Sequence, residues 1–271
     1  MSEISPKGRT LVNALGIPGI LLMIWLGGIY FSLFITVVLV LALKEFYSLY
    51  RIKGIYASFP MGLVGSAFFI WFYYTEPYLN MLAFVQLAIA FITLVLLFEL
   101  FSNKVNPAAN VAYTIFGVTY IPLLLGTLIA LRQIDMTYGT YYTFAVFLSI
   151  WLCDSAAFGF GMKWGKKKIF PRVSPNKSWI GSIAGFFSVL IFFHVLSYFH
   201  LPSADFTFQD VIVFSIISGI FGQLGDFIES LFKRDAGVKD SGAFLMGHGG
   251  VLDRFDSLIL AAPLTYFYLL F

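Results

Sequence analysis

Nine long apolar runs, separated by short polar or glycine-containing segments, make up most of this chain. The runs cover residues 11–28, 29–49, 58–75, 79–101, 110–131, 140–162, 179–199, 211–232 and 254–271. A helix needs about 20 mostly apolar residues to cross a bilayer, and each run is close to that length. With 59% hydrophobic residues among 271, no water-soluble fold could bury this much apolar surface. We therefore predict an all-α, polytopic integral membrane protein with about nine transmembrane helices.

The first two runs are separated only by Gly27 and Gly28, so they could also form one re-entrant pair. Glycine and proline at such positions are typical of broken helices. A bilayer tolerates a break where other protein segments form hydrogen bonds with the free backbone groups. Residues 1–10 are predicted to be a short polar tail, and the first run does not have the pattern of a removable signal peptide. Cys153 is the single cysteine, so no intrachain disulfide is expected.

The basic residues fall almost entirely on one side of such a bundle. If nine spans alternate, the N-terminus and the loops after spans 2, 4, 6 and 8 share one side of the membrane. That side holds 16 of the 17 Lys and Arg residues, and only Arg132 lies opposite. Because Lys and Arg in short loops mark the cytoplasmic side, we predict a cytoplasmic N-terminus and an external C-terminus.

The residues capable of chemistry are unevenly distributed between the two halves of the chain. Spans 1–5 contain few, apart from Lys44, Glu45 and Glu99 near their predicted cytoplasmic ends. Spans 6–9 and the two cytoplasmic loops beside them contain nearly all the rest. We therefore assign packing or oligomerisation to residues 1–135 and catalysis to residues 136–271, within one continuous membrane domain.

Four acidic residues lie inside or at the start of the last two spans, where lipid makes charge expensive. Asp226 and Glu229 lie in span 8, and Asp253 and Asp256 open span 9. An acid near the centre of a membrane helix costs about 2.5–3.5 kcal/mol on insertion scales. Because residues three or four apart share a helical face, each span presents one short acidic face. The two faces are predicted to converge beside the cytoplasmic surface.

Two interpretations of these acids compete. Each acid could pair with a neighbouring Lys or Arg and simply hold helices together. Carboxylates gathered with few histidines and no second cysteine instead suit a hard cation with oxygen ligands, chiefly Mg²⁺. We favour the metal interpretation, because several acids surround a basic loop and a fifth acid, Asp154, lies within span 6.

The loop at 163–178, KWGKKKIFPRVSPNKS, carries more than a membrane anchor needs. Its Ser-Pro-Asn-Lys-Ser turn leads into the next helix, which Ser178 or Asn176 could cap. The free N–H groups at a helix start form an anion site, and Lys177 would add positive charge there. The loop is therefore predicted to contribute to binding an anionic substrate.

The loop at 233–253 contains GHGG at 247–250, directly before the last span. Glycines allow a backbone to approach a phosphate closely, and a helix start favours negative charge. His248 is predicted either to contact phosphate or to transfer a proton. The motif could also be a plain turn, so its interpretation depends on the charged residues on either side.

The segment Ser230–Asp256, which we call the signature segment, reads SLFKR-x4-KD-x-G-x5-HGGV-x-DRFD. It closely resembles the signature of phosphatidate cytidylyltransferases, also called CDP-diacylglycerol synthases. Upstream, CDSAAFGFG at 153–161 and SPNKSWIG at 174–181 are similar to further elements of that family in the same order. The resemblance covers most of residues 150–257, whereas spans 1–5 are similar only in general hydrophobic character.

Two positions depart from the family pattern. Met246 stands where members usually have Pro, which alters the stiffness of the loop. Ile180 stands where members often have Glu, so any role of that Glu is in doubt in this chain.

The resemblance implies that CTP and phosphatidic acid react, with Mg²⁺, to give CDP-diacylglycerol and pyrophosphate. A lipid phosphate oxygen would attack the α-phosphorus of CTP, so the enzyme mainly positions reactants and neutralises charge. It also implies a bacterial cytoplasmic (inner) membrane, an active site facing the cytoplasm, contact with membrane lipids and no nucleic-acid partner. A second cation beside Mg²⁺ and a homodimer formed through spans 1–5 are left open.

The residues already selected can be given roles on this basis. The expected catalytic residues are Asp226, Lys233, Lys239, Asp253 and Asp256. The expected metal ligands are Asp226, Asp253 and Asp256, with Glu229 as an outer ligand. The expected substrate-binding residues are Lys177, Arg172, Ser230, Arg234, His248, Gly249, Gly250 and Arg254. Asp154 and Asp240 are expected to support the site.

Three other functions are weighed against this one. A CTP-dependent polyprenol or lipid kinase has a broadly similar membrane plan, but it transfers the γ-phosphoryl group to an alcohol. A CDP-alcohol phosphotransferase also uses intramembrane aspartates, but its DGxxAR-type motif is absent from the sequence. A cation-coupled transporter commonly has internal repeats and midplane sites, whereas these acids cluster toward one face and we find no repeat.

Overall fold

The computed structural model describes residues 6–76, 78, 80–242 and 249–271, with side chains from residue 16 onward. Within these residues the chain forms α-helices and two π-helical segments, and the β-type pairing is one isolated bridge, between Lys168 and Ser178. The elements are α1 (Pro6–Leu26), α2 (Gly28–Arg51), α3 (Phe59–Thr75), α4 (Met81–Leu100), α5 (Pro107–Val118), η1 (Thr119–Leu123), α6 (Thr127–Gln133), α7 (Tyr138–Trp164), α8 (Trp179–Tyr198), α9 (Phe208–Ile216), η2 (Ile217–Phe221), α10 (Gly222–Asp235) and α11 (Leu252–Leu270). The predicted all-α class is confirmed.

Among the described residues, six helical segments are long and apolar enough to cross a membrane. They are α2, α4, α5 to α6, α7, α8 and α9 to α10. The other predicted spans correspond to α1, α3 and α11. Helix α3 is uncharged but has 17 residues, which makes it shorter than the six segments. Helix α11 is long enough but carries Asp253, Arg254 and Asp256 near its start. The chain is a membrane protein, while the count of nine spans stays a prediction.

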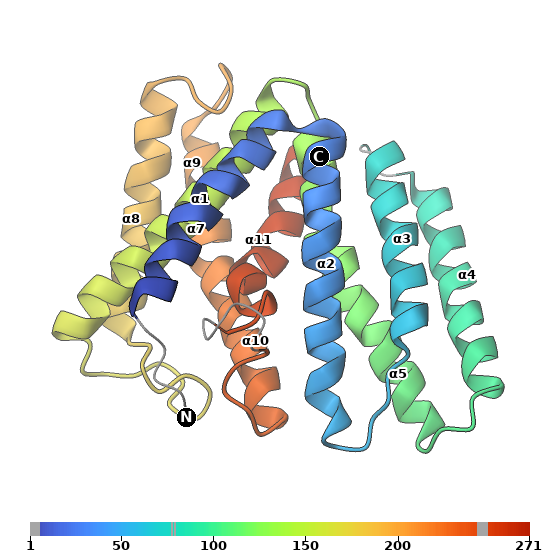
Figure 1. Ribbon diagram of the computed structural model, residues 1–271. Helices are drawn as coiled ribbons and strands as arrows, with labels where there is room; N and C mark the ends of the chain where they lie inside the picture. The colour runs from blue at the N-terminus through green and yellow to red at the C-terminus, as the bar shows by residue number, and fades with distance from the viewer. Residues whose placement is uncertain (1–5, 77, 79, 243–248) are drawn as a thin grey trace.

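The charged loops lie at one end of the helical bundle. Figure 1 shows the connections after α2, α4, α7 and α10 at that end, and the C-terminus at the opposite end. This grouping agrees with the predicted segregation of basic residues, because those are the loops that carry them. The compartment that this end faces stays a prediction.

The break between α1 and α2 is made by two glycines. Gly27 and Gly28 have φ angles of 61° and 47°, a left-handed region that favours glycine. The Arg132 side chain lies against Gly27, and its Nε donates to the Ile24 carbonyl oxygen at 2.8 Å. The first helix begins at Pro6, so the second half of the predicted polar tail is helical instead. Proline is well suited to a first helical position because it needs no N–H partner there.

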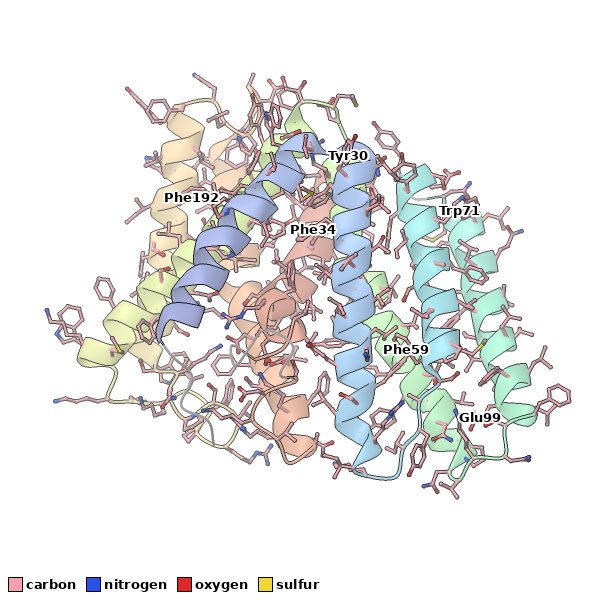
Figure 2. The ribbon with its side chains drawn as sticks, in the orientation of Figure 1. Tyr30, Phe34, Phe59, Trp71, Glu99 and Phe192 are labelled. Carbon is pink, nitrogen blue, oxygen red and sulfur yellow. The ribbon has the colours of Figure 1, made fainter. Side chains whose placement is uncertain are left out.

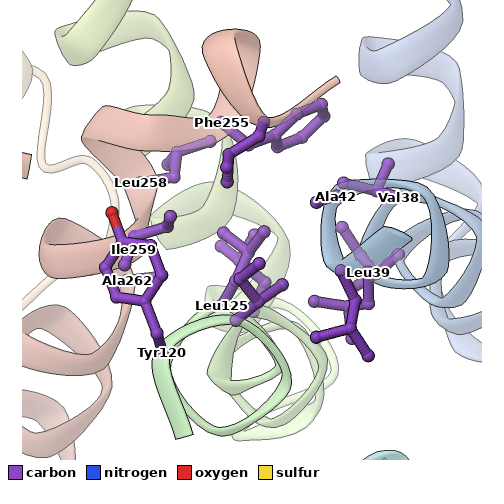
Figure 3. Close-up of a cluster of buried hydrophobic side chains, with 14 of the residues drawn as sticks. Val38, Leu39, Ala42, Tyr120, Leu125, Phe255, Leu258, Ile259 and Ala262 are labelled. Carbon is purple, nitrogen blue, oxygen red and sulfur yellow. The ribbon is translucent and has the colours of Figure 1, made fainter. Parts of the chain in front are cut away.

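Helix α11 packs in the middle of the bundle against elements from both halves of the chain. Figure 3 shows its buried face beside α2 and the α5–α6 region, with the side chains of Phe255, Leu258, Ile259 and Ala262 near Val38, Leu39, Ala42, Tyr120 and Leu125. In the most apolar stretch of the segment 107–133, 72% of the residues are buried inside the protein, compared with 11% in α4. Helix α4 therefore lies at the periphery. Figure 2 shows Trp71 of α3 and Glu99 of α4 on this peripheral side.

The two segments predicted as single spans at 110–131 and 211–232 each contain a π-helical turn. The first, η1, contains Pro122, which lacks the N–H that a regular helix would use. The second, η2, directly precedes α10. Such widened turns redirect the following side chains and are frequent at functional sites.

Candidate functional site

Gly225 allows α10 and α11 to cross at close range. A Cβ at this position would lie 2.5 Å from the Asp256 carbonyl oxygen and 3.2 Å from the Ser257 Cα. The two helices run in opposite directions, so successive turns of one face successive turns of the other (Figure 1). The acidic faces of the two helices therefore meet, as their spacing predicts.

Lys233 joins the two acidic faces at the end of α10. Its buried Nζ forms an ion pair with Glu229 on the same helix and lies 2.5 Å from the Asp253 Oδ1 on α11. One turn deeper, the Ser230 hydroxyl donates to the Asp226 Oδ1 at 3.3 Å. This part of the site combines two carboxylates with one lysine, which limits the cost of burying their charges.

A second group of acids surrounds Asp226. Asp256 is half-buried, accepts the Ser257 N–H at 2.7 Å, and lies close enough to Asp226 and Glu229 for their charges to interact. Asp154 of α7 interacts electrostatically with Asp226 in the same way. Three helices therefore bring carboxylates toward one region.

The basic loop between α7 and α8 is attached to α10. The Lys177 Nζ forms an ion pair with Asp226 and lies 4.4 Å from the centre of the Phe227 ring. The Arg234 Nε donates to the Val173 carbonyl oxygen at 3.2 Å, so Arg234 holds the loop in place. The loop thus supplies Lys177 to the acidic site.

The start of α8 has the predicted cap. The Ser178 side chain accepts the Gly181 N–H at 3.3 Å, so Ser178 rather than Asn176 is the capping residue. Glycines also bring α7 and α8 together, since a Cβ at Gly181 would lie 2.6 Å from the Ala157 carbonyl oxygen. One side of a pocket is built from this close pair of helices.

The pocket has a volume of about 530 Å³ and lies between α7, α8, α10 and the basic loop. Its charged part is lined by Asp154, Lys168, Lys177 and Asp226, together with amide and hydroxyl side chains of the basic loop, α8 and α10. Phe158 and Met162 of α7 line its apolar part, and both are largely exposed on the outside of the bundle. One pocket therefore offers a charged interior and an apolar side toward the membrane region.

The glycines before α11 allow carboxylates of the protein itself to approach the backbone. Gly249 has a φ of 80°, and a Cβ there would lie 2.6 Å from the Asp253 Oδ2. That oxygen accepts the Gly250 N–H at 2.6 Å and the Ser241 hydroxyl at 2.9 Å. The predicted backbone donor Gly250 is therefore used by Asp253 in this structure, and its contact with substrate phosphate stays a prediction.

Glu45 of α2 also reaches this loop, and the sequence interpretation gave it no role in the site. Its carboxylate accepts the N–H groups of Val251 and Leu252, each at 2.9 Å. The signal that could have found it is an acid in an otherwise apolar span, the same signal that selected Asp226.

Tyr120 of η1 is a second residue that the sequence did not indicate. Its buried hydroxyl has no hydrogen-bond partner among the described residues. It lies close enough to Glu229, Asp226 and Asp256 for their charges to act on it. A tyrosine in an apolar span of an aromatic-rich chain gives no distinctive sequence signal.

The remaining predicted residues are exposed, buried in the helix crossing, or outside the described chain. Arg172, Lys239, Asp240 and Arg254 have exposed side chains in the two loops and at the start of α11. His248 and Met246 lie outside the described residues, so the predicted role of His248 stays a prediction. Ser230 and Lys233 are buried within the helix crossing.

The described residues fit a Mg²⁺ ion that shares its coordination with a substrate. They contain no group of three or more His, Cys, Asp or Glu side chains arranged as a complete metal site. Mg²⁺ is usually held by one or two carboxylates together with substrate phosphates, and it keeps several waters. Asp226 lines the pocket, and Asp256 lies close enough to it for their charges to interact, so these two carboxylates are the candidate ligands. The third expected ligand, Asp253, pairs with Lys233, and the role of all three as metal ligands stays a prediction.

Comparison with known proteins identifies relatives along nearly the whole chain. The sequence model described as the cytidylyltransferase family matches residues 7–271. A Staphylococcus aureus protein named phosphatidate cytidylyltransferase is 33% identical over 260 residues, covering 95% of this chain and 96% of the relative. The protein of the same name from Staphylococcus haemolyticus is 35% identical over 262 residues, with the same coverage of both chains.

Proposed function

This chain belongs to the cytidylyltransferase family, and from that premise we propose that it transfers a cytidylyl group from CTP to phosphatidic acid. The products would be CDP-diacylglycerol, for phospholipid synthesis, and pyrophosphate. One observation supports this most directly. The pocket places the Lys177–Asp226 pair beside an apolar flank of α7, so that a soluble anion and a lipid phosphate could meet there.

The proposed reaction forms one bond and breaks one bond at the α-phosphorus of CTP. A phosphate oxygen of the lipid attacks, and the bond from the α-phosphorus to the bridging oxygen breaks, leaving its electron pair on pyrophosphate. The attacking oxygen is already ionised near neutral pH, so no strong general base is required. The residues therefore act mainly by positioning the two anions and neutralising their charge.

The chain's own residues divide this task between them. Lys177 and Lys233 supply positive charge against the phosphates, while Asp226 and Asp256 would hold Mg²⁺. A bound Mg²⁺ would stabilise negative charge on the attacking and leaving oxygens. Arg172, Lys239 and Arg254 have exposed side chains, whose positive charge would attract the nucleotide.

The lipid would approach from the side of the bundle. Phe158 and Met162 form an apolar flank, along which acyl chains could remain in the membrane while the phosphate enters the pocket. We further propose that the loop-bearing end faces the cytoplasm of a bacterial inner membrane, because short basic loops mark that side. A homodimer would use the N-terminal helices, among which α4 is less covered than α2 or the segment 107–133.

The test is to incubate purified protein with labelled CTP, phosphatidic acid and Mg²⁺ and to identify the products. We expect labelled CDP-diacylglycerol and free pyrophosphate, with turnover lost in EDTA and restored by added Mg²⁺. A lipid kinase would instead release CDP and label no lipid with cytidine. Cation uptake into sealed vesicles without nucleotide would indicate a transporter and would contradict the proposal.

A further inference from the structure

Glu45 connects the N-terminal half of the chain to the signature segment. It lies near the loop-bearing end of α2, and its side chain is buried. Its Oε1 accepts the Val251 N–H at 2.9 Å, and its Oε2 accepts the Leu252 N–H at 2.9 Å. The Ser241 hydroxyl lies 3.4 Å from the same Oε2. All three groups belong to the signature segment.

The carboxylate takes the place of a missing helix cap. The residue before α11 is Val251, which has no side chain that could accept the free N–H groups of the first turn. The positive end of the helix dipole also stabilises a carboxylate at this position. Gly250 permits the approach, because a Cβ there would lie 2.3 Å from the Glu45 Oε2. A residue of α2 therefore accepts hydrogen bonds from the free N–H groups at the beginning of α11.

The contact extends directly to one of the acids at the helix crossing. Ser241 donates its hydroxyl to the Asp253 Oδ2 at 2.9 Å while lying beside Glu45. Asp253 also takes the Gly250 N–H, the donor that precedes the two bound by Glu45. Glu45 and Asp253 thus share the start of α11, and together they use three consecutive backbone N–H groups.

We propose that Glu45 is a positioning residue, which holds the start of α11 on α2 and thereby sets where Asp253 and Asp256 stand opposite α10. It lies outside the substrate pocket and acts through α11. The proposal rests on the proposed function in one respect, since the positions of these acids matter for turnover only if they serve the reaction. It also explains why α11 starts without its own cap, because the cap comes from another helix.

The negative charge of Glu45, and not only its volume, is needed for this role. A carboxylate can accept at both oxygens, whereas an amide can accept at one and donates at the other. Glu45→Gln would keep the shape of the side chain but turn an N–H₂ group toward either Val251 or Leu252. One backbone N–H would then lose its partner inside the protein.

Glu99→Gln provides a matched control. Glu99 is also a buried glutamate of the N-terminal half, near the same end of the bundle, and its Oε1 accepts a hydrogen bond from Asn110 at 2.8 Å. This contact joins α4 to α5 and involves no part of the signature segment. Any general cost of changing a buried glutamate to glutamine would therefore appear in both variants.

The experiment measures hydrogen–deuterium exchange and steady-state rates on the full-length protein. We expect E45Q to exchange about tenfold faster in the peptide containing Val251 and Leu252, the effect of losing one hydrogen bond to a charged group. Exchange in α8 should not change. The kcat should fall about tenfold, with less than about a twofold change in the KM for CTP, because the contact lies outside the pocket. E99Q should change neither measurement.

Several outcomes would overturn the proposal. Wild-type exchange around Val251 in E45Q would show that the carboxylate does not hold α11. Faster exchange with an unaltered kcat would show that Glu45 anchors the start of α11 but does not position the acids for turnover. Faster exchange across α8 as well would show a role in global stability only. If the wild-type protein makes no CDP-diacylglycerol, the proposed function fails, and the exchange measurement still decides whether Glu45 holds the helix.

Discussion

At the scale of single residues, the site is a set of paired charges on α10, α11 and the basic loop. Lys177 pairs with Asp226, and Lys233 pairs with both Glu229 and Asp253. Removing one partner of a buried ion pair destabilises the protein, because the other charge is left without a partner. A partner can therefore be displaced most easily by another ion of the same sign. CTP would offer phosphates to the lysines, and Mg²⁺ would offer charge to the acids. The pairs are thus compatible with both interpretations of the acids, structural and functional.

Asp226→Asn is the substitution that best separates these interpretations. The amide keeps the shape of the side chain but loses the charge that pairs with Lys177 and would bind a metal ion. We expect turnover to fall by about 100-fold or more. Changing even a residue that only orients a metal ligand typically lowers metal affinity or activity by about 10–100-fold. The amount of protein inserted in the membrane should be unchanged.

Asp235→Asn is the control for this prediction. Asp235 lies on the same helix and pairs with Lys53 at 2.8 Å, but its side chain is half exposed at the end of α10. An exposed ion pair contributes little, so this variant should keep its activity. Equal rates for both variants and the wild type, measured as pyrophosphate release, would show that Asp226 is structural.

At the scale of helices, the site depends on how closely α10 and α11 approach. Gly225 lies next to Asp226, against the backbone of α11. Gly225→Ala would place a methyl group 2.5 Å from the Asp256 carbonyl oxygen and force the helices apart. Overpacking of this kind typically costs about 1–3 kcal/mol. We expect a lower Tm and a marked loss of activity, because both acids would move.

Gly159→Ala is the matched control, since the same change in α7 meets no atom within 4 Å. Its Tm and activity should equal those of the wild type or slightly exceed them, because alanine favours helix more than glycine does. If Gly225→Ala behaves like Gly159→Ala in thermal unfolding and in product formation, the crossing does not require a glycine.

The sequence predicts the helices better than it predicts the contacts between them. The apolar runs locate nearly every helix to within a few residues, because lipid demands long uninterrupted stretches. The acidic faces that carry Asp226 and Asp256 also follow from spacing, and both are predicted to lie beside the cytoplasmic surface. The contact of Glu45 with α11 does not follow, because it joins positions about 200 residues apart and depends on which helices pack together. The π-helical turn before α10 is equally absent from the pattern of apolar residues.

At the scale of the whole molecule, the segregation of charge predicts which side of the membrane the candidate site faces. The loops after α2, α4, α7 and α10 share one end of the bundle (Figure 1). The loop after α7 reaches the site from that end, because its Lys177 pairs with Asp226. CTP is a soluble anion that cannot cross the bilayer unaided, so a site that uses it must open to the compartment that contains it. The predicted orientation and the proposed reaction therefore depend on each other and can be tested together.

Single cysteines at the two ends of the bundle would test this orientation. Met136 lies in the connection between α6 and α7 and is 91% exposed, while Lys167 is exposed in the basic loop. We expect Met136→Cys to react with a membrane-impermeant thiol reagent in intact cells, and Lys167→Cys to react only after permeabilisation. The wild-type protein should not react, because its one cysteine, Cys153, is buried. Labelling of Lys167→Cys in intact cells would place the pocket outside and remove its access to cytoplasmic CTP. It would contradict the orientation and the proposed reaction together, even if all nine spans were present.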